Sequence, residues 1–494
     1  MLALIIFALT LFGILRTPFG LGIWVYSSFG AVAALTLGLV EMSDLGVIFA
    51  LIWDSALTLI ALIVISFCLQ GLGFFEWLIF YVLKFCATSR YSSHATNLES
   101  RAHLGSTLHI NTRKAFVALI LLNSILSAVL ANDGAVLVLT PLVLGLFLRA
   151  KNTLPLQIIA FLFSAAFVCD ISSNPLIISN LTNIITAHFH ALGFAEFAHK
   201  MFLPNLFAVF GATALFLLFF RAPLRTPLIF RTPSKPKLQN ALFALHCATL
   251  VVFIASFFLS THFDLPLSLN CAVYAGVLLI TLWHKSRQKA IATMRRAPFG
   301  IIVFVFGLFV VVFGVQKLDF TEAQNALFYA LIALYDKSEI AGIFVVASVS
   351  ALGSSVINNL PMVLFGNLAI DEFFGSHTLA IAQNLQNLAQ NLTQDFAQNF
   401  DTQSLTNLAT QTPIQNLKES FIYAHLLGCN IGSKLTPIGS LCTLLWLSLI
   451  AKNSLLAQKG IIFTFLHYCK YSLIFTLPTL FLATLGLYIS HFAF

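Results

Sequence analysis

Long apolar stretches, separated by short basic segments, alternate along the whole chain. Apolar runs of about 18 residues or more have the length that a helix needs to cross a membrane. The first run, MLALIIFALTLFGILR, has no basic leader and no small-residue cleavage site. We therefore expect a first spanning helix there rather than a removable signal. Further spans are predicted at 22–40 and 47–70, and the pattern indicates an all-α polytopic membrane protein.

The composition narrows the class of protein further. Of the 494 residues, 59% are hydrophobic and 9% are charged, which leaves no room for a separate soluble domain. The net charge of +8 comes from Lys and Arg in a few loops, as the positive-inside rule expects, and requires no nucleic acid. We find no nucleophile–base set, no metal-ligand spacing and no phosphate-binding loop. The sequence therefore predicts no enzyme, no metal and no cofactor.

Basic residues gather in five segments between the apolar stretches, and we assign these segments to the cytoplasm. Three spans precede the first of them, so the N-terminus is expected outside. The apolar segment 73–86 would move the first basic segment outside if it crossed the membrane. We therefore expect it to lie along the inner interface. The five basic segments are 84–114, Arg149 with Lys151, 221–237, 285–296, and Lys452 with Lys459 and Lys470.

The sequence ANDGAVLVLTP places a carboxylate and a glycine in the middle of the apolar region 115–150. Basic residues flank both ends of this region, so Asn132, Asp133 and Gly134 fall at a turn between two legs. The legs allow a re-entrant hairpin or two short full spans. Non-helical backbone inside a membrane is tolerated only where protein buries it or where it lines a cavity. We predict a re-entrant hairpin with functional polar residues at its tip.

A second polar tip, SSVINNLP, aligns Asn358 and Asn359 with Asn132 and Asp133 without gaps. Its flanks lack the basic clusters of the first tip, and span parity places them outside. The hairpin 340–370 is therefore expected to enter the membrane from the opposite face.

Each predicted hairpin is followed by an apolar segment with a polar break. The two segments are FVCDISSNPLIISNLTNI, within 156–192, and LGCNIGSKLTPIGSLCTLLW, within 420–451. The words CDI and CNI align at one constant offset, and Pro175 or Pro437 interrupts each helix. These features predict an inverted repeat with two broken helices, as in secondary transporters that build a site at the membrane midplane.

The predicted organisation is two repeats joined by a cytoplasmic linker. Leu and Phe recur in an insertion of the second repeat, at Leu385, Leu388, Leu392, Phe396 and Phe400. The spacing predicts a neutral amphipathic helix on the periplasmic surface, with low-complexity disorder as the alternative. The first repeat is 1–220, with hairpin 115–150 and broken helix 156–192; the linker is 221–239; the second repeat is 240–494, with hairpin 340–370, insertion 376–418 and broken helix 420–451.

Five segments spread over nearly the whole chain resemble the arsenical pump membrane proteins, the ArsB-type arsenite carriers of the ion transporter superfamily. They are GFFEW, ANDGAVLVLTP, PLIISNLTNI, INNLPMVLFGNLAI and LTPIGSLCTLLWL. The resemblance implies a multi-pass protein of the bacterial inner membrane that exports trivalent arsenite and antimonite, driven by the proton gradient. Some members pair with a cytoplasmic arsenite-stimulated ATPase, so such a subunit is a candidate partner, and a homodimer is a candidate assembly.

Arsenite near neutral pH is mainly uncharged As(OH)3, which requires hydroxyl and amide partners rather than a fixed charge. Glycine residues would let the backbone approach it closely. The predicted substrate-binding residues are Asn132, Asp133, Gly134, Ser172, Ser173, Asn174, Asn358, Asn359, Cys429, Asn430, Gly432 and Thr436.

Proton coupling is assigned to Asp133, Asp170 and Lys434, because ionisable groups inside a membrane are costly and usually functional. Where the family often has Gly-Cys-Asp, this chain has Asn430, so one carboxylate is missing. Asp54 is a further membrane acid, expected nearer the outer interface and ranked below the others.

Soft thiolates bind trivalent arsenic strongly, and Cys169, Cys429 and Cys442 lie near the two breaks in the sequence. A site of three thiols would hold arsenite too tightly for easy release. We therefore expect recognition mainly by hydroxyl and amide groups, with Cys429 the most suitable thiol.

Two other hypotheses for the function remain open from the sequence. A sodium/proton antiporter or an organic-anion carrier of the same superfamily would share the polar tips, although an anion carrier requires a fixed positive charge that only Lys434 offers. A non-transporting membrane subunit or receptor would not require paired polar tips.

Overall fold

The computed structural model describes residues 1–88, 107–231, 237–260, 263, 265–318, 321–375, 402–451, 453–461 and 463–493. Within these ranges, eight helices are long and apolar enough to cross a membrane. The prediction of an all-α polytopic membrane protein is confirmed. The amphipathic pattern predicted for residues 385–400 lies outside the described residues.

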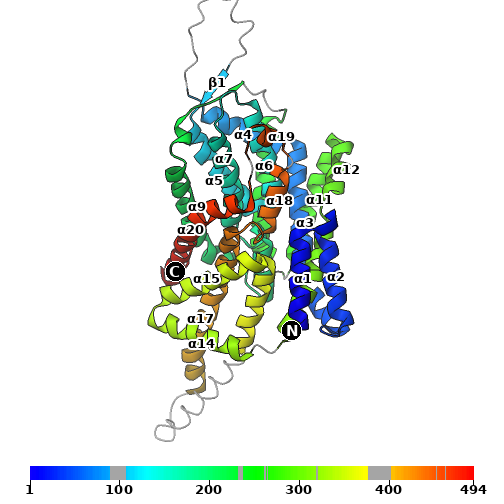
Figure 1. Cartoon of the computed structure of the whole chain (residues 1–494), viewed down its shortest axis with the longest axis vertical. Coiled ribbons are helices and arrows are strands. Elements are labelled where there is room, and N and C mark those ends of the chain that lie inside the picture. The colour runs from blue at the N-terminus through cyan, green and yellow to red at the C-terminus, as the bar shows by residue number, and fades with distance from the viewer. Residues whose placement is uncertain are drawn as a thin grey trace, which may run out of the picture.

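Three N-terminal helices lie at one side of the molecule, in the segments predicted as the first three spans (Figure 1). Of these, α3 is long and apolar enough to cross a membrane, while α1 and α2 are shorter apolar helices. A short 3-10 turn, η1 (Pro18–Gly20), joins the first two. The helices are α1 (Leu2–Arg16), α2 (Ile23–Thr36) and α3 (Met42–Leu72).

Helix α4 (Phe74–Phe85) follows α3 after Gly73. Its 12 residues would extend about 18 Å, too short to cross a bilayer. Trp77 stacks on Phe243, and its indole N–H donates to the side-chain oxygen of Asn240, at 3.1 Å. The contacts fit the interfacial position that we expect for segment 73–86.

The first predicted hairpin consists of α5 (Thr112–Leu130) and α6 (Asn132–Arg149). The helices are separated by Ala131 alone, which has φ 61° and ψ 146°. An alanine rarely adopts such a conformation, which costs on the order of 1–3 kcal/mol. The break therefore lies one residue before the predicted tip. Gly134 was expected to break a helix, and it instead lies inside the first turn of α6.

The first broken helix consists of α7 (Pro155–Ile171), the 3-10 turn η3 (Ile177–Ser179) and α8 (Leu181–Phe189). Pro155 occupies the first turn of α7, where its missing N–H costs nothing. The long helix α9 (Phe194–Phe219) comes next.

A two-stranded antiparallel sheet ties the start of α5 to the segment after α9. Strand β1 (Thr107–Ile110) pairs with β2 (Leu228–Arg231), so that Thr107 lies opposite Arg231. The 3-10 turn η4 (Pro223–Arg225) precedes β2. This sheet was not predicted, because its strands are short and lie within basic loops.

Four helices form the first part of the second predicted repeat, which begins at residue 240. Helix α11 packs along α3, and α13 packs against α2 and α3. The helices are α10 (Asn240–Ser260), α11 (Leu267–Lys285), α12 (Arg287–Arg296) and α13 (Gly300–Gln316).

The second predicted hairpin follows α14 (Thr321–Lys337) and begins with α15 (Glu339–Ile357). Asn358, with φ 82° and ψ 151°, separates α15 from a helix over 359–375. The two hairpins thus break at single residues with nearly the same unusual backbone conformation.

The second broken helix begins earlier than the predicted 420. Helix α17 (Thr402–Gly432) starts inside the segment predicted as an insertion, so residues 402–418 continue directly into the broken helix. The remaining elements are η6 (Ser433–Leu435), α18 (Leu441–Ala451), α19 (Ser454–Gln458) and α20 (Phe465–Ala493).

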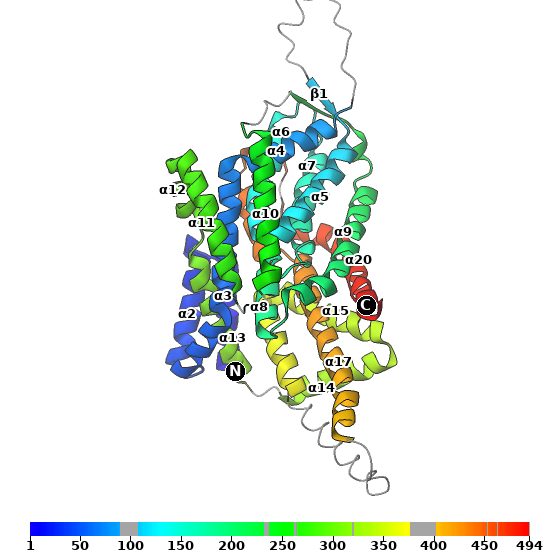
Figure 2. The same cartoon turned by 180° about the vertical axis from the view of Figure 1, so that it is seen from behind.

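The hairpins lie in opposite halves of the molecule. Figure 2 shows α5, α6 and α7 in the half that carries β1, and α14 and α15 in the other half. The basic helix α12 lies at the β1 end, which the positive-inside rule assigns to the cytoplasm. Near the middle, α20 packs along α9 and α17, with Phe216 in ring contact with Phe163, Phe167 and Phe475.

Candidate functional site

The two broken helices meet through a buried ion pair. Lys434 Nζ lies 2.5 Å from Asp170 Oδ2, and the side chains are 0% and 1% exposed. Ser440 donates to the same oxygen at 2.7 Å, while the Asn132 side chain donates to Asp170 Oδ1 at 2.6 Å. The Asp170 carboxylate is therefore held by three donors, from α6, from η6 and from the residue before α18. We call this contact the ionic crossing, because Asp170 lies in the last turn of α7 and Lys434 lies in η6.

A second crossing between the same helices carries no charge. The Asn430 side-chain nitrogen donates to Asn174 Oδ1 at 2.9 Å and to Asn183 Oδ1 at 2.8 Å, and its oxygen accepts from Thr182 Oγ at 2.5 Å. Asn430 is fully buried. We call this contact the neutral crossing. Every polar atom of the Asn430 side chain has a partner without any ligand present.

The second hairpin is fixed to the second broken helix through backbone groups. The Asn358 side chain donates to the Ile438 carbonyl, and the Asn359 backbone N–H donates to the Gly439 carbonyl, both at 2.8 Å. Thr436 donates to the Ser355 carbonyl at 2.5 Å. These three predicted substrate ligands therefore hold helix breaks together and do not contact either crossing side chain.

Glycine permits close helix contact at two predicted site positions. A Cβ atom at Gly432 would lie 2.2 Å from the Cα of Ala351 in α15. A Cβ atom at Gly134 would lie 2.6 Å from Ser66 Oγ in α3. The two glycines thus permit close helix packing in this conformation.

Asp133 differs sharply from Asp170. It is 5% exposed and, among the described residues, its carboxylate has no hydrogen bond and no ion pair. The Asp133 backbone N–H donates to the Asn132 side-chain oxygen at 2.9 Å, a bond that leaves the carboxylate unpaired. An isolated buried carboxylate is costly to keep charged.

The serines of the first break bond to nearby carbonyl groups. Ser172 donates to the Val168 carbonyl and Ser173 donates to the Asp170 carbonyl. Both hydroxyls are therefore already in use where the sequence predicted substrate contacts.

The three candidate thiols do not assemble into one site. Cys169 donates to Asn123 Oδ1, Cys442 lies 3.9 Å from the Asn132 carbonyl, and Cys429 lies 3.6 Å from His425 Nε2. No group of three His, Cys, Asp or Glu side chains in the described ranges has the geometry of a metal site.

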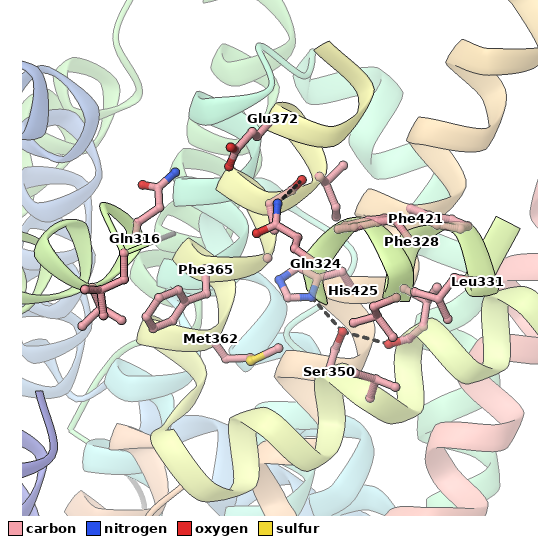
Figure 3. Close-up of a pocket in the computed structure, with 18 residues that line it drawn as sticks. Gln316, Gln324, Phe328, Leu331, Ser350, Met362, Phe365, Glu372, Phe421 and His425 are labelled. Carbon is pink, nitrogen blue, oxygen red and sulfur yellow. Dashed lines mark hydrogen bonds between the residues drawn. The ribbon is translucent and has the colours of Figure 1, made fainter. Parts of the chain in front are cut away.

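The sequence analysis missed His425, which reaches from α17 into a cavity of about 420 Å³ (Figure 3). His425 Nδ1 lies 2.8 Å from Ser350 Oγ. Most of the lining is apolar and includes Phe328 and Phe365. No predicted substrate residue lines this cavity, and the two crossings are close-packed.

Thr182, Asn183, Ser440 and Thr443 were also missed. Thr443 accepts from Lys434 Nζ at 2.7 Å, as Asn183 bonds to Asn430. The constant offset between the two breaks was the available signal, since it aligns Asn183 with Thr443 and Asn180 with Ser440.

These observations define a polytopic membrane protein with a buried polar site where two broken helices cross. A family model described as "Arsenical pump membrane protein" matches residues 2–410 and 381–491. An arsenical pump membrane protein of Escherichia coli is 33% identical over 99% of each chain. One of Yersinia enterocolitica is 32% identical over 98% of each chain. A putative arsenical pump membrane protein of Bacillus subtilis is 23% identical over 90% of this chain and 91% of its own.

The chain belongs to the arsenical pump membrane protein family. The resemblance predicted from the five sequence segments is confirmed, as is its placement as a multi-pass protein of the bacterial inner membrane.

Proposed function

We propose that the protein exports trivalent arsenite and antimonite from the cytoplasm, with one proton entering for each uncharged molecule exported. Membership of the arsenical pump family supports the substrate. The proton-coupled step rests on one observation, the contrast between the lone Asp133 carboxylate and the neutralised Asp170 carboxylate.

Asp170 is poorly suited to bind and release protons during transport. Its charge is balanced by Lys434, and Asn132 and Ser440 also donate to it. Protonating Asp170 would leave the Lys434 cation buried without its partner, which is strongly unfavourable. Asp170 and Lys434 therefore hold the two broken helices together and remain part of the site.

Asp133 is the better candidate for the proton carrier. With Asp170 and Lys434 charged, an ionised Asp133 gives the three groups one net negative charge, and a protonated Asp133 gives none. The site then differs by one charge between its two forms, while As(OH)3 contributes none. Exchange of one proton for one As(OH)3 is therefore electrogenic.

The electrogenic cycle sets the size of the driving force. One charge crossing 100 mV supplies about 2.3 kcal/mol. One pH unit supplies about 1.4 kcal/mol, the free energy of a ten-fold concentration ratio. The roughly 2.3 kcal/mol from 100 mV therefore sustains a roughly fifty-fold arsenite gradient without any pH difference.

The neutral crossing supplies the groups that an uncharged trihydroxide requires. Asn174, Asn183, Asn430 and Thr182 offer amide and hydroxyl partners to one another, and As(OH)3 offers both donors and acceptors. We expect the substrate to replace these contacts when the two broken helices separate.

Uptake of arsenite into everted membrane vesicles tests the proposal. Wild-type vesicles should concentrate arsenite when their interior is acidic or positive, and not when protons equilibrate freely. Asp133→Asn should lose concentrative uptake but keep arsenite exchange down its gradient. Asp371→Asn, which removes a half-exposed carboxylate at the surface, is the control and should behave as wild type.

Concentrative uptake by Asp133→Asn vesicles would exclude Asp133 as the proton carrier. The same vesicles distinguish the alternatives, because a sodium/proton antiporter would respond to sodium without arsenite. An organic-anion carrier would be inhibited by dicarboxylates. Coupling to a separate ATPase would appear as ATP-dependent uptake after the proton gradient is dissipated.

A further inference from the structure

A second cavity, of about 540 Å³, lies between α3, the end of α8 and the start of α11. Asp54 and His188 are the charged or titratable side chains in its lining. The cavity also touches Ile177 in η3, three residues beyond Asn174 of the neutral crossing. Leu265 and Pro266 in the lining join α10 to α11, whose other ends carry basic segments assigned to the cytoplasm, so the cavity lies toward the outer face and reaches the break of the first broken helix.

Asp54 is held at the edge of this cavity by the N-terminus of α11. Its Oδ1 accepts from the Ser268 backbone N–H at 2.9 Å, and the residue is 4% exposed. Carboxylates are stabilised at helix N-termini. Cys271 on α11 lies close enough to Asp54 for their charges to interact, and His188 also lines the cavity.

Two hydroxyl groups next to Asp54 have no partner. Ser55 and Thr58 are both 0% exposed, and within the described ranges neither hydroxyl makes a hydrogen bond. Some buried hydroxyls bond to their own helix, as Thr484 does to the Leu480 carbonyl, whereas Thr140 and Thr479, like Ser55 and Thr58, have no partner among the described residues. A buried polar group without a protein partner usually binds water.

The polar groups near Asp54 are followed by further polar groups along α3. Asp54 and Thr58 are one helical turn apart and share a face, and Ser66 lies two turns further along. Ser66 contacts the turn of α6 that contains Gly134, directly beside Asp133. Ser66 is rotated by about 120° from Asp54 around the helix axis, so these polar groups wind partly around α3 from the cavity toward the lone carboxylate.

We propose that this cavity is the outer aqueous entrance to the transport site. Water held by Ser55 and Thr58 carries the incoming proton from Asp54 toward Asp133. The proton moves by transfer along hydrogen-bonded water, and no bond other than O–H forms or breaks. The assignment rests on the proposed function for its cargo, but the presence of water at these residues is a separate claim.

Cysteine labelling tests that separate claim. We choose Ser55→Cys because it is nearly isosteric, and Thr58→Cys as a second variant. Intact spheroplasts are treated with a small, positively charged, membrane-impermeant methanethiosulfonate. The wild-type protein, with its native cysteines and treated in the same way, sets the background. Leu59→Cys, next to Thr58 and equally buried, is the control.

Both Ser55→Cys and Thr58→Cys should react well above the wild-type background, and Leu59→Cys should not. Equal reactivity of all three variants, or none above background, would overturn the entrance. A reaction seen only in everted vesicles would also overturn it, because the path would then open to the cytoplasm.

Measurements of transport give the second test of the proposal. Thr58→Val removes the hydroxyl at constant shape and should slow gradient-driven uptake about ten-fold, the effect of one lost hydrogen bond, while arsenite exchange stays unchanged. Thr484→Val removes a hydroxyl already bonded within its helix and should have no effect. Unchanged gradient-driven uptake in Thr58→Val would exclude the proton path.

The two arms separate this proposal from the proposed function. If Ser55→Cys is labelled but wild-type uptake ignores the proton gradient, the entrance stands and the proton coupling fails. If uptake follows the gradient but neither cysteine is labelled, the proposed function stands and the proton reaches Asp133 by another route.

Discussion

The ionic and the neutral crossings occupy corresponding places but contain opposite chemistry. The constant offset seen in the sequence aligns Asp170 with Asn430 and Asn174 with Lys434. In the structure Asp170 contacts Lys434, and Asn430 contacts Asn174. Each contact therefore joins the earlier position of one break to the later position of the other.

The two crossings are suited to different roles, because one resists separation of the helices and the other can exchange its contacts for those of a substrate. A buried ion pair resists separation, because parting it exposes two charges to a poor solvent. Amide and hydroxyl contacts each contribute only about 0.5–1.5 kcal/mol net and are easily exchanged for those of an uncharged solute. We infer that the ionic crossing fixes the two broken helices, while the neutral crossing opens to substrate.

The largest expected effect comes from breaking the ionic crossing. Lys434→Met leaves the Asp170 carboxylate buried without its cation, at a cost of about 3–5 kcal/mol. The yield of folded protein in detergent, measured by size-exclusion chromatography, should fall severely. Asp170→Asn added to Lys434→Met removes the stranded charge and should restore most of that yield. A double variant no better than Lys434→Met would mean that the pair does not act as a unit.

A charge added to the neutral crossing tests whether this crossing tolerates a carboxylate as the ionic crossing does. In Asn430→Asp, one carboxylate oxygen would face the side-chain oxygens of Asn174 and Asn183, whose nitrogens already donate to carbonyls. An acceptor buried without a donor costs about 1–3 kcal/mol. Thermal unfolding followed by tryptophan fluorescence should show a lower midpoint than wild type.

The loss in Asn430→Asp should be smaller at pH 5 than at pH 8, because a protonated carboxyl can donate to Asn174 as the amide does. Adding Asn174→Lys should restore stability at pH 8 by rebuilding an ion pair at this crossing. No recovery with Asn174→Lys would show that the two crossings are not interchangeable environments.

The close contacts beside the two crossings should respond unequally to added volume. Gly432→Ala would place a methyl group against the Ala351 backbone, which cannot move aside, and should cost about 1–3 kcal/mol. The closest atom to a methyl group in Gly134→Ala is the Ser66 hydroxyl oxygen, which can turn away, and the Ser66 Cβ and the Ile63 backbone lie further off. The smaller loss in unfolding midpoint of Gly134→Ala should disappear in the double variant with Ser66→Ala. An equal loss at both glycines would contradict this reading.

Much of the fold followed from local sequence, because apolar length and proline act through neighbouring residues. Helix α3 and the two breaks near Pro175 and Pro437 lie where the pattern predicted them. The start of α17 at Thr402 was missed, since the Gln- and Asn-rich composition that precedes it is typical of loops. The inverted relation of the two halves stays a prediction.

The site was predicted only as a set of residue types. The sequence offered Asp133 and Asp170 as equivalent acids and left Lys434 free to pair with either. Which acid it pairs with depends on how η6 meets the end of α7, a contact between segments far apart in the chain. The same holds for Cys429, whose position on α17 turns it toward His425 and away from Asn430.

The smallest expected effect concerns the thiols, which lie beside both crossings without joining either. Cys169→Ser keeps a donor for Asn123, Cys429→Ser keeps a polar contact with His425, and Cys442→Ser faces the Asn132 carbonyl. Because the three sulfur atoms each contact a different group, they do not form a common site for arsenic. The triple serine variant should therefore retain arsenite export within about two-fold, a change below 0.5 kcal/mol on the scale where 1.4 kcal/mol is ten-fold. Arsenite uptake into everted vesicles measures it, normalised to the amount of folded protein. Loss of uptake in Cys429→Ser alone, with normal folding, would replace recognition by hydroxyl and amide groups with recognition by a thiol.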